Sequence, residues 1–560
     1  MTQTGIKTLR DSAGMRWTAL LLLALAMFCA YIFMDILSPI KEYMESTRGW
    51  DSGSFGRMQG AEVFLNVYVF FLIFAGIILD KMGVRFTAVL SGAVMLVGGI
   101  IKFYAVSDMF TGTSLESWFT NHLNWNGDLP IIGSILPFAE GMPASAKLAA
   151  CGFMIFGCGC EMAGITVSRG IVKWFKGRET ALAMGSEMAL ARLGVATCMI
   201  FSPFFAKLGG GIHVDNAVKF GVVLLCIALI MFIVYFFMDK KLDAQTGEAE
   251  EKDDPFKFSD LGKIFTSLGF WLVALLCVLY YSAIFPFQKY AVNMLQCNLD
   301  LTEADPNTFW GKNAVTIVQY IIMLVVAACA FSSNFMKKNK GLKYGLMGMA
   351  ILALIVYCYM GYMRGTAETI FAVFPLLAVA ITPILGNYVD HKGKAATMLM
   401  LGSILLVVCH LTFAFILPGV SASSPAGGVV VAYITILVLG ASFSLVPAAL
   451  WPSVPKLVDE KIIGSAYAAI FWIQNIGLGL FPTLIGNVLE STNADNPKVI
   501  AAKAAIKAGE EGVLVPYDYK WALVMLASLG IAALLISIYL KAVDKKKGYG
   551  LEEPNIKPQA

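Results

Sequence analysis

Four ionisable side chains stand inside long apolar stretches of the chain: Asp35, Glu161, Glu187 and Arg192. A charged group near the centre of a bilayer costs about 2.5–3.5 kcal/mol on insertion scales, so such residues are expected to face a cavity or one another. A carboxylate can hold an ammonium group, and a guanidinium can hold a carboxylate through two parallel hydrogen bonds. Glu161 and Arg192 together therefore predict a site for a small zwitterion. The alternative is a structural salt bridge between two helices.

The remaining polar candidates allow more than one interpretation. Asp35 fits a cavity residue, a proton carrier or an interfacial residue. Glu187 precedes Arg192 by five residues, about 140° around a straight helix, so the two are expected on different faces. Further candidates for the cavity wall are Tyr280, Tyr281, Tyr467, Gln474 and Asn475, with packing as the alternative for each aromatic residue.

The elements that must position these side chains are membrane helices. Of 560 residues, 58% are hydrophobic and only 14% are charged, whereas a soluble domain carries about a quarter charged residues. Each apolar run is long enough to cross the bilayer core. The runs lie near 17–38, 58–79, 86–105, 148–171, 180–206, 218–238, 264–287, 313–335, 345–362, 369–389, 395–417, 429–450, 462–488 and 521–541. The sequence predicts an all-α membrane protein of about 14 helices.

Lysine and arginine alternate between successive loops, which predicts the orientation because cytoplasmic loops are enriched in them. The N-terminus, the charged segment 239–263 and the tail 542–560 are expected in the cytoplasm, and the loop 107–147 outside. We expect a bacterial inner membrane as the location.

A short pattern occurs twice, each time at the end of an apolar run. Residues 76–85 read GIILDKMGVR and residues 386–395 read GNYVDHKGKA. Both contain glycine, three residues, aspartate, two residues and glycine, which suits a tight turn between helices. The residues of this repeated signature are Gly76, Asp80, Lys81, Gly83, Arg85, Gly386, Asp390 and Gly393. Two copies indicate an internal duplication.

This signature resembles that of the major facilitator superfamily, where it lies between helices 2 and 3 and, in degenerate form, between helices 8 and 9. The resemblance implies a major facilitator fold of two six-helix halves, 1–238 and 264–541, joined by a cytoplasmic linker, 239–263. Two extra runs then form an inserted transmembrane hairpin, 313–362, although 345–362 need not be a span.

Two longer stretches, 157–194 and 450–486, resemble the lysosomal dipeptide transporter branch of that superfamily. Shared features include Trp-Phe-Lys-Gly, Ala-Arg-Leu-Gly and Gln-Asn-Ile-Gly, while Cys160 stands where the branch has glycine. The resemblance implies that Glu161 and Arg192 bind substrate and that the substrate is a dipeptide. Two different functions fit the same charged residues: transport of an organic anion, and a membrane receptor without flux.

Motifs for other chemistry were not found in the sequence. It contains no nucleotide-binding loop, dinucleotide fingerprint or metalloprotease helix. The cysteines fall mainly in apolar runs and suit packing. We therefore expect no enzyme activity, no cofactor, no metal and no nucleic acid; the expected partners are a small-molecule substrate and the lipid bilayer, and the chain is expected to be a monomer.

Overall fold

The computed structural model describes residues 8–125, 136–176, 178–246, 258–299, 301, 312–333, 336, 339–458 and 463–554. These residues form helices and connecting segments without any strand. Twelve of the helical segments are long and apolar enough to cross a membrane. In the lipid core each backbone amide must find its partner within its own segment, and helices meet that requirement.

The first group of helices comprises α1 (Ala13–Asp35), α2 (Lys41–Arg48), α3 (Ser52–Gly60), α4 (Phe64–Tyr68), α5 (Phe71–Val106), α6 (Ser114–Asn121), α8 (Ala144–Trp174), α9 (Thr180–Ala206) and α10 (Val214–Thr246). The second comprises α11 (Phe258–Phe265), α12 (Leu268–Asn298), α13 (Lys312–Ser333), α14 (Lys340–Arg364), α15 (Ala367–Phe371), α16 (Val373–Lys392), α17 (Ala395–Leu411), α18 (Leu417–Ser423), α19 (Pro425–Leu457), α20 (Ile463–Thr492), α21 (Pro497–Lys507) and α22 (Lys520–Lys547).

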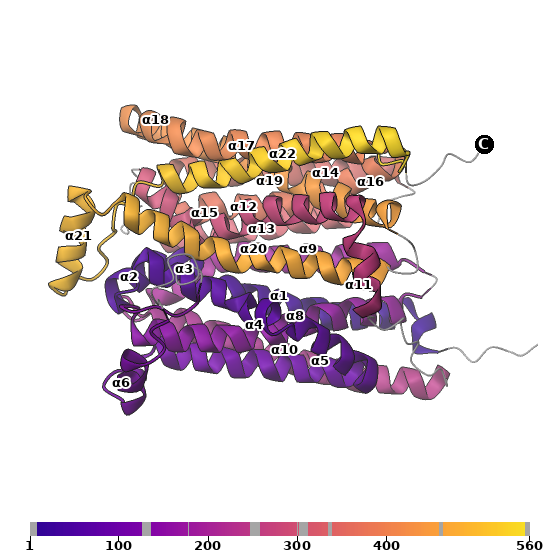
Figure 1. Cartoon of the computed structure of the whole chain (residues 1–560), viewed down its shortest axis with the longest axis horizontal. Coiled ribbons are helices and arrows are strands. Elements are labelled where there is room, and N and C mark those ends of the chain that lie inside the picture. Colours follow the sequence, from indigo (N-terminus) through magenta and orange to yellow (C-terminus); the bar gives the residue numbers. More distant parts are fainter. Residues whose placement is uncertain are drawn as a thin grey trace, which may run out of the picture.

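The same packing recurs in both groups. In the first, α1 packs on α9 and α10, while α5 packs on α8 and α10. In the second, α12 packs on α20 and α22, while α17 packs on α19 and α22. We call the two sets the N-terminal and C-terminal bundles. Figure 1 shows them side by side, with most helices along the long axis.

The turns of the repeated signature explain its glycines. Gly83 breaks α5 with φ 79° and ψ 167°, so α5 is two helices that meet there. The end of the expected run 58–79 and the whole of the run 86–105 therefore lie within a single span, Phe71–Val106. Gly393 (φ 71°) ends α16 in the same way. A side chain is strained at such φ values, which glycine adopts freely.

Two features differ from the predicted runs. The run 58–79 is not one helix: a 3₁₀ turn, η3 (Ala61–Val63), separates α3 from α4, and Phe70 has φ 56° before α5. The charged segment 239–263 starts inside α10, where Asp239 is fully buried; residues 247–257 lie outside the described part of the chain.

The helices α13 and α14 lie where the sequence predicts the inserted hairpin. They pack on each other, and α13 also packs on α9 and α16, which belong to different bundles. Of the two, α14 is long enough to be a span, whereas the apolar part of α13, Ile317–Ser333, is shorter. The hairpin thus sits on the flank of the junction between the bundles.

The molecule has two distinct ends. The small helices α6 and α21 lie at one, on the left of Figure 1, and α11 lies at the other. We call the first the loop end. The second, the signature end, carries the Gly83 and Gly393 turns.

Candidate functional site

A cavity of about 2180 Å³ lies between the two bundles. Its lining includes α5, α8 and α9 from the N-terminal bundle and α16, α19 and α20 from the C-terminal bundle. It reaches the signature end, where Asp80, Lys176 and Asp390 line it, and the hairpin contributes Lys343 and Tyr344. The small helices of the loop end contribute no lining residue. The cavity therefore opens at the signature end.

The loop end is closed because α3 and α20 touch along their backbones. A Cβ added to Gly56 would overlap the Pro482 carbonyl, and one added to Gly60 would overlap the Gly479 carbonyl. The Tyr290 hydroxyl lies 2.9 Å from the Ser52 carbonyl oxygen of one bundle and 3.1 Å from the Pro482 carbonyl oxygen of the other, and its single hydrogen can be donated to either. Glycine at these positions lets the two bundles seal this end without side chains between them.

A buried phenol adds to the seal. Tyr517 donates to Glu45 Oε1 at 2.5 Å and lies 2.8 Å from Glu490 Oε1. Burial, followed by the charge of Glu45, raises the pKa of Tyr517, so the phenol keeps its proton and bridges the two bundles.

Arg192 enters the cavity from α9 and rests against the opposite bundle. Its guanidinium carbon lies 5.0 Å from the ring centre of Phe285 and 4.9 Å from that of Phe443. Within the described residues it makes no ion pair. The aromatic faces orient the cation and leave its hydrogen-bond donors available. Such an arginine can accept the carboxylate or another planar anion of a solute.

Glu161 reaches the cavity from α8 and also contacts the opposite bundle. Its Oε1 accepts a hydrogen bond from Asn475 Nδ2 of α20 at 3.1 Å. No ion pair with Arg192 occurs in the described part of the chain, so a salt bridge between these helices is not what the structure contains. One carboxylate and one guanidinium thus line the same cavity without neutralising each other.

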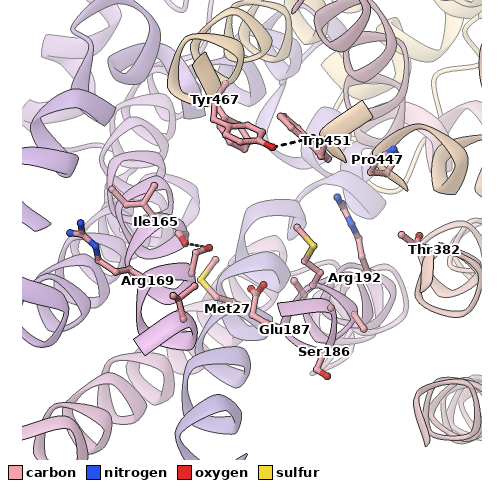
Figure 2. A pocket seen from close by; sticks show the side chains of 18 of the residues that line it. Met27, Ile165, Arg169, Ser186, Glu187, Arg192, Thr382, Pro447, Trp451 and Tyr467 are labelled. Carbon is pink, nitrogen blue, oxygen red and sulfur yellow. Dashed lines mark hydrogen bonds between the residues drawn. The ribbon is translucent and has the colours of Figure 1, made fainter. Parts of the chain in front are cut away.

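Glu187 lines the cavity as well, although its spacing predicts a different face of α9 from that of Arg192. Figure 2 shows Glu187 and Arg192 both directed into the space between the helices. The reason is that the cavity is wide enough to expose more than one face of α9. The spacing of two residues along a helix predicts the angle between their side chains, but it does not predict how wide the cavity beside that helix is.

An aromatic wall stands on the C-terminal bundle. Trp451 Nε1 donates to the Tyr281 hydroxyl at 3.1 Å, and the Tyr467 hydroxyl donates to the Trp451 carbonyl at 3.0 Å (Figure 2). The Phe471 ring stacks on Trp451 at 4.9 Å. Trp451, Tyr281, Tyr467 and Phe471 all line the cavity. They offer apolar faces that suit the side chains of a solute.

Four predicted residues lie away from the cavity lining. Tyr280 is fully buried and bonded to Ser442 Oγ at 2.6 Å, and Gln474 Oε1 lies 3.3 Å from Cys277 Sγ. Asn475 sits behind Glu161. Asp35 is buried near the loop end, with Lys289 Nζ at 2.7 Å.

The signature residues surround the mouth of the cavity. Asp80 pairs with Arg169 at 2.7 Å, and both line the mouth together with Gly76, Gly386 and Asp390. Arg85 pairs with Asp243 at 3.3 Å, whereas Lys81 is exposed.

Asp239, which the sequence pattern did not single out, anchors the same region. It accepts from Lys173 at 2.6 Å and Trp174 at 2.8 Å. The helical pattern of the run 218–238 continues past residue 238, and this continuation could have placed Asp239 within the helix.

The described residues contain no group of three or more histidine, cysteine or acidic side chains that could hold a metal.

Two like bundles around a cavity open at one end define a transporter fold, and the family comparison agrees. The chain belongs to the Major Facilitator Superfamily, whose model matches residues 23–367.

Among characterised relatives, the chain is similar to the lysosomal dipeptide transporter MFSD1. It is 25% identical to the Danio rerio protein over 368 residues, which is 64% of each chain. It is 23% identical to the Homo sapiens protein over 368 residues, 64% of this chain and 63% of that one. The match spans just under two thirds of these relatives.

Solved structures share the fold at low identity. The nucleoside transporter NupG aligns with a TM-score of 0.55 at 10% identity, over 93% of this chain and 99% of that one. A D-xylose-proton symporter aligns with a TM-score of 0.56 at 11% identity, over 94% and 97%. A structure reported for proton dependent oligopeptide transporters aligns with a TM-score of 0.54 at 13% identity, over 97% and 100%.

Proposed function

We propose that this transporter moves small zwitterionic solutes, with dipeptides as the main class, by alternating access. The observation that carries the proposal is the pairing of Arg192 and Glu161 in one cavity without an ion pair between them. A dipeptide brings one ammonium and one carboxylate, and it satisfies both groups at once. The similarity to MFSD1, described as a dipeptide transporter, supports the same class.

The aromatic wall supports dipeptides over free amino acids. A dipeptide adds a second side chain and an amide to the two charged ends. The rings of Trp451, Tyr281 and Phe471 supply apolar surface for side chains without selecting a particular one. This arrangement suits many sequences of the same length.

The test is uptake into proteoliposomes that contain the purified chain. Alanyl-alanine should exchange across the membrane in counterflow, and acetyl-alanyl-alanine, which lacks the ammonium, should compete poorly. Glu161→Gln and Arg192→Gln should each abolish alanyl-alanine counterflow. The proposal fails if a panel of dipeptides gives neither flux nor a shift of the thermal unfolding midpoint.

The second candidate is a transporter of small organic anions. It is favoured by the state of Arg192, whose donors lack an acidic partner in the described part of the chain. In that case an organic anion such as succinate should exchange, Arg192→Gln should abolish exchange, and Glu161→Gln should leave it intact. The Glu161 substitution therefore separates the two candidates.

We further propose a bacterial inner membrane as the location, with the signature end in the cytoplasm. Basic residues of the signature end support this orientation: Lys173 and Lys176 line the cavity, and Lys81 and Arg85 belong to the repeated signature. Labelling of single cysteines with a membrane-impermeant reagent on intact cells tests it. A monomer is proposed, and light scattering of the purified protein tests that.

A further inference from the structure

Glu187 is a cavity carboxylate to which the proposed function gives no role. Figure 2 shows it directed into the space between the helices. Among the described residues it forms no hydrogen bond and no ion pair. Residues three and four positions away share its face of α9, and all of them are apolar and offer no side-chain donor: Ala183, Met184, Leu190 and Ala191. The carboxylate is therefore available to a solute.

Three charged side chains face the same part of the cavity. Tyr31 of α1 lines this part, and the charges of Glu161, Glu187 and Arg192 all act on its hydroxyl. Because such interactions weaken with distance, the three charged groups lie around one space. With both carboxylates ionised, the three groups carry one excess negative charge. A zwitterion has no net charge, so it binds two of the groups and leaves that excess in place.

Glu187 lies on the arginine side of this space. The charge of Arg192 acts on Glu187, whereas the group that acts on Glu161 is the amide of Asn475. Glu187 is therefore the nearer of the two carboxylates to Arg192. A dipeptide that gives its ammonium to Glu161 and its carboxylate to Arg192 has its C-terminal residue at the arginine. The side chain of that C-terminal residue is the one that lies closer to Glu187.

The separation of Glu187 from Arg192 suits a long side chain. Five residues of helix rise by about 7–8 Å, and α9 begins near the signature end, so Glu187 lies on the mouth side of Arg192. A lysine side chain reaches about 6 Å from its Cα, given bonds of about 1.5 Å. Met188, which lines the cavity and is 62% exposed, offers apolar surface beside Glu187 for the carbon stem. A solute with such a side chain can contact all three charged groups.

We propose that Glu187 is a subsite for a cationic side chain, so that the protein prefers dipeptides whose C-terminal residue is lysine or arginine. The cation of that side chain binds Glu187 while Glu161 and Arg192 hold the two ends of the peptide. The single positive charge of such a solute neutralises the excess negative charge of the three groups. This inference rests on the proposed function and narrows its substrate class.

The test compares alanyl-lysine with alanyl-norleucine by titration calorimetry at neutral pH. Norleucine has the same carbon stem as lysine and lacks the ammonium group. The unmodified protein should bind alanyl-lysine at least about fivefold more tightly, because a charge-assisted contact inside a cavity exceeds an exposed ion pair. Glu187→Gln should reduce that ratio of Kd values to below about twofold by the same reasoning. Lysyl-alanine, which has the same net charge, should bind more weakly than alanyl-lysine to the unmodified protein.

Glu179→Gln is the matched control, since it removes one carboxylate at the start of the same helix. Glu179 is 54% exposed, pairs with Arg16 at 3.6 Å and does not line the cavity. This variant should keep the full preference for alanyl-lysine. Glu187→Lys reverses the charge and should prefer alanyl-glutamate to alanyl-glutamine, which tests the subsite even if Glu187→Gln does not fold. Each ratio compares two ligands on one protein, so a general loss of affinity does not imitate the expected result.

The proposal is overturned if the unmodified protein binds alanyl-lysine no more tightly than alanyl-norleucine, or if Glu187→Gln keeps the full preference. Tighter binding of lysyl-alanine than of alanyl-lysine would overturn the assignment of Glu187 to the C-terminal side chain. In each of these cases the binding of alanyl-norleucine shows that the proposed dipeptide function still stands. If no dipeptide binds the unmodified protein, the proposed function itself fails, and the subsite fails with it.

Discussion

Removal of the guanidinium at residue 192 should weaken dipeptide binding by a predictable amount. Arg192 rests on Phe285 and Phe443 and has no acidic partner in the described part of the chain. Its donors are therefore available to a solute carboxylate without first breaking an ion pair. A hydrogen bond to a charged group contributes about 1.5–3 kcal/mol, which corresponds to about 10–150-fold in Kd. We expect Arg192→Gln to weaken alanyl-alanine binding within that range.

The assay is a cycle of two changes measured by titration calorimetry on purified protein. One change is Arg192→Gln, and the other replaces alanyl-alanine by its C-terminal amide. Each alone should weaken binding about equally, and both together should cost little more than one, because they remove the same contact. Arg48→Gln is the control: Arg48 pairs with Asp108 outside the cavity lining and should leave both affinities unchanged.

The reasoning would be refuted if amidation weakened binding to the Arg192→Gln variant as much as to the unmodified protein. That outcome would place the solute carboxylate elsewhere.

Three further predictions concern stability at the signature end, each measured by the thermal unfolding midpoint in detergent. Asp239→Asn should destabilise the protein by about 2–4 kcal/mol because it leaves Lys173 and the buried amide imperfectly paired. The control is Asp243→Asn, which should cost less than about 1 kcal/mol because Asp243 is partly exposed. Equal effects of the two substitutions would contradict this prediction. Gly393→Ala should cost about 1–3 kcal/mol, because φ is 71° and the added Cβ overlaps the C-terminal tail at Glu552. Gly386→Ala should be neutral, because the space around Gly386 is open. An unchanged unfolding midpoint for Gly393→Ala would contradict the predicted strain at this turn. Glu552→Ala should cost about 1 kcal/mol because its Oε1 accepts from Thr397 N at the start of α17; an unchanged midpoint would show that the tail does not stabilise this helix.

Much of the fold was predictable because the sequence patterns that indicate it extend over many residues. Apolar runs of membrane length marked the helices, and the repeated signature marked the two turns at Gly83 and Gly393. Interruptions were not predictable from the runs. The break at Ala61–Val63 depends on close packing against neighbouring helices, where a Cβ on Gly157 would meet the Glu62 carbonyl. The sequence of one segment alone does not predict such a contact, because the contact depends on a second segment.

The candidate site was predictable only in part. Glu161 and Arg192 stood out because charge in the middle of an apolar run is costly. Two buried lysines, Lys102 and Lys289, did not, since Lys102 sits near the end of its run and Lys289 just past the end of 264–287. The helix α12 continues to Asn298, which places Lys289 inside the protein. The tertiary packing, rather than the local pattern, made these two residues buried.

The size of the cavity has an osmotic consequence. A volume of about 2180 Å³ holds on the order of seventy waters, given about 30 Å³ for each. A dipeptide fills only a small share of that space, so each opening of the signature end hydrates far more volume than the solute occupies. The balance between conformations should then respond to the activity of water itself. An inert osmolyte too large to enter would favour the state with the smaller chamber, and the turnover of the protein would vary with the hydration of the cell.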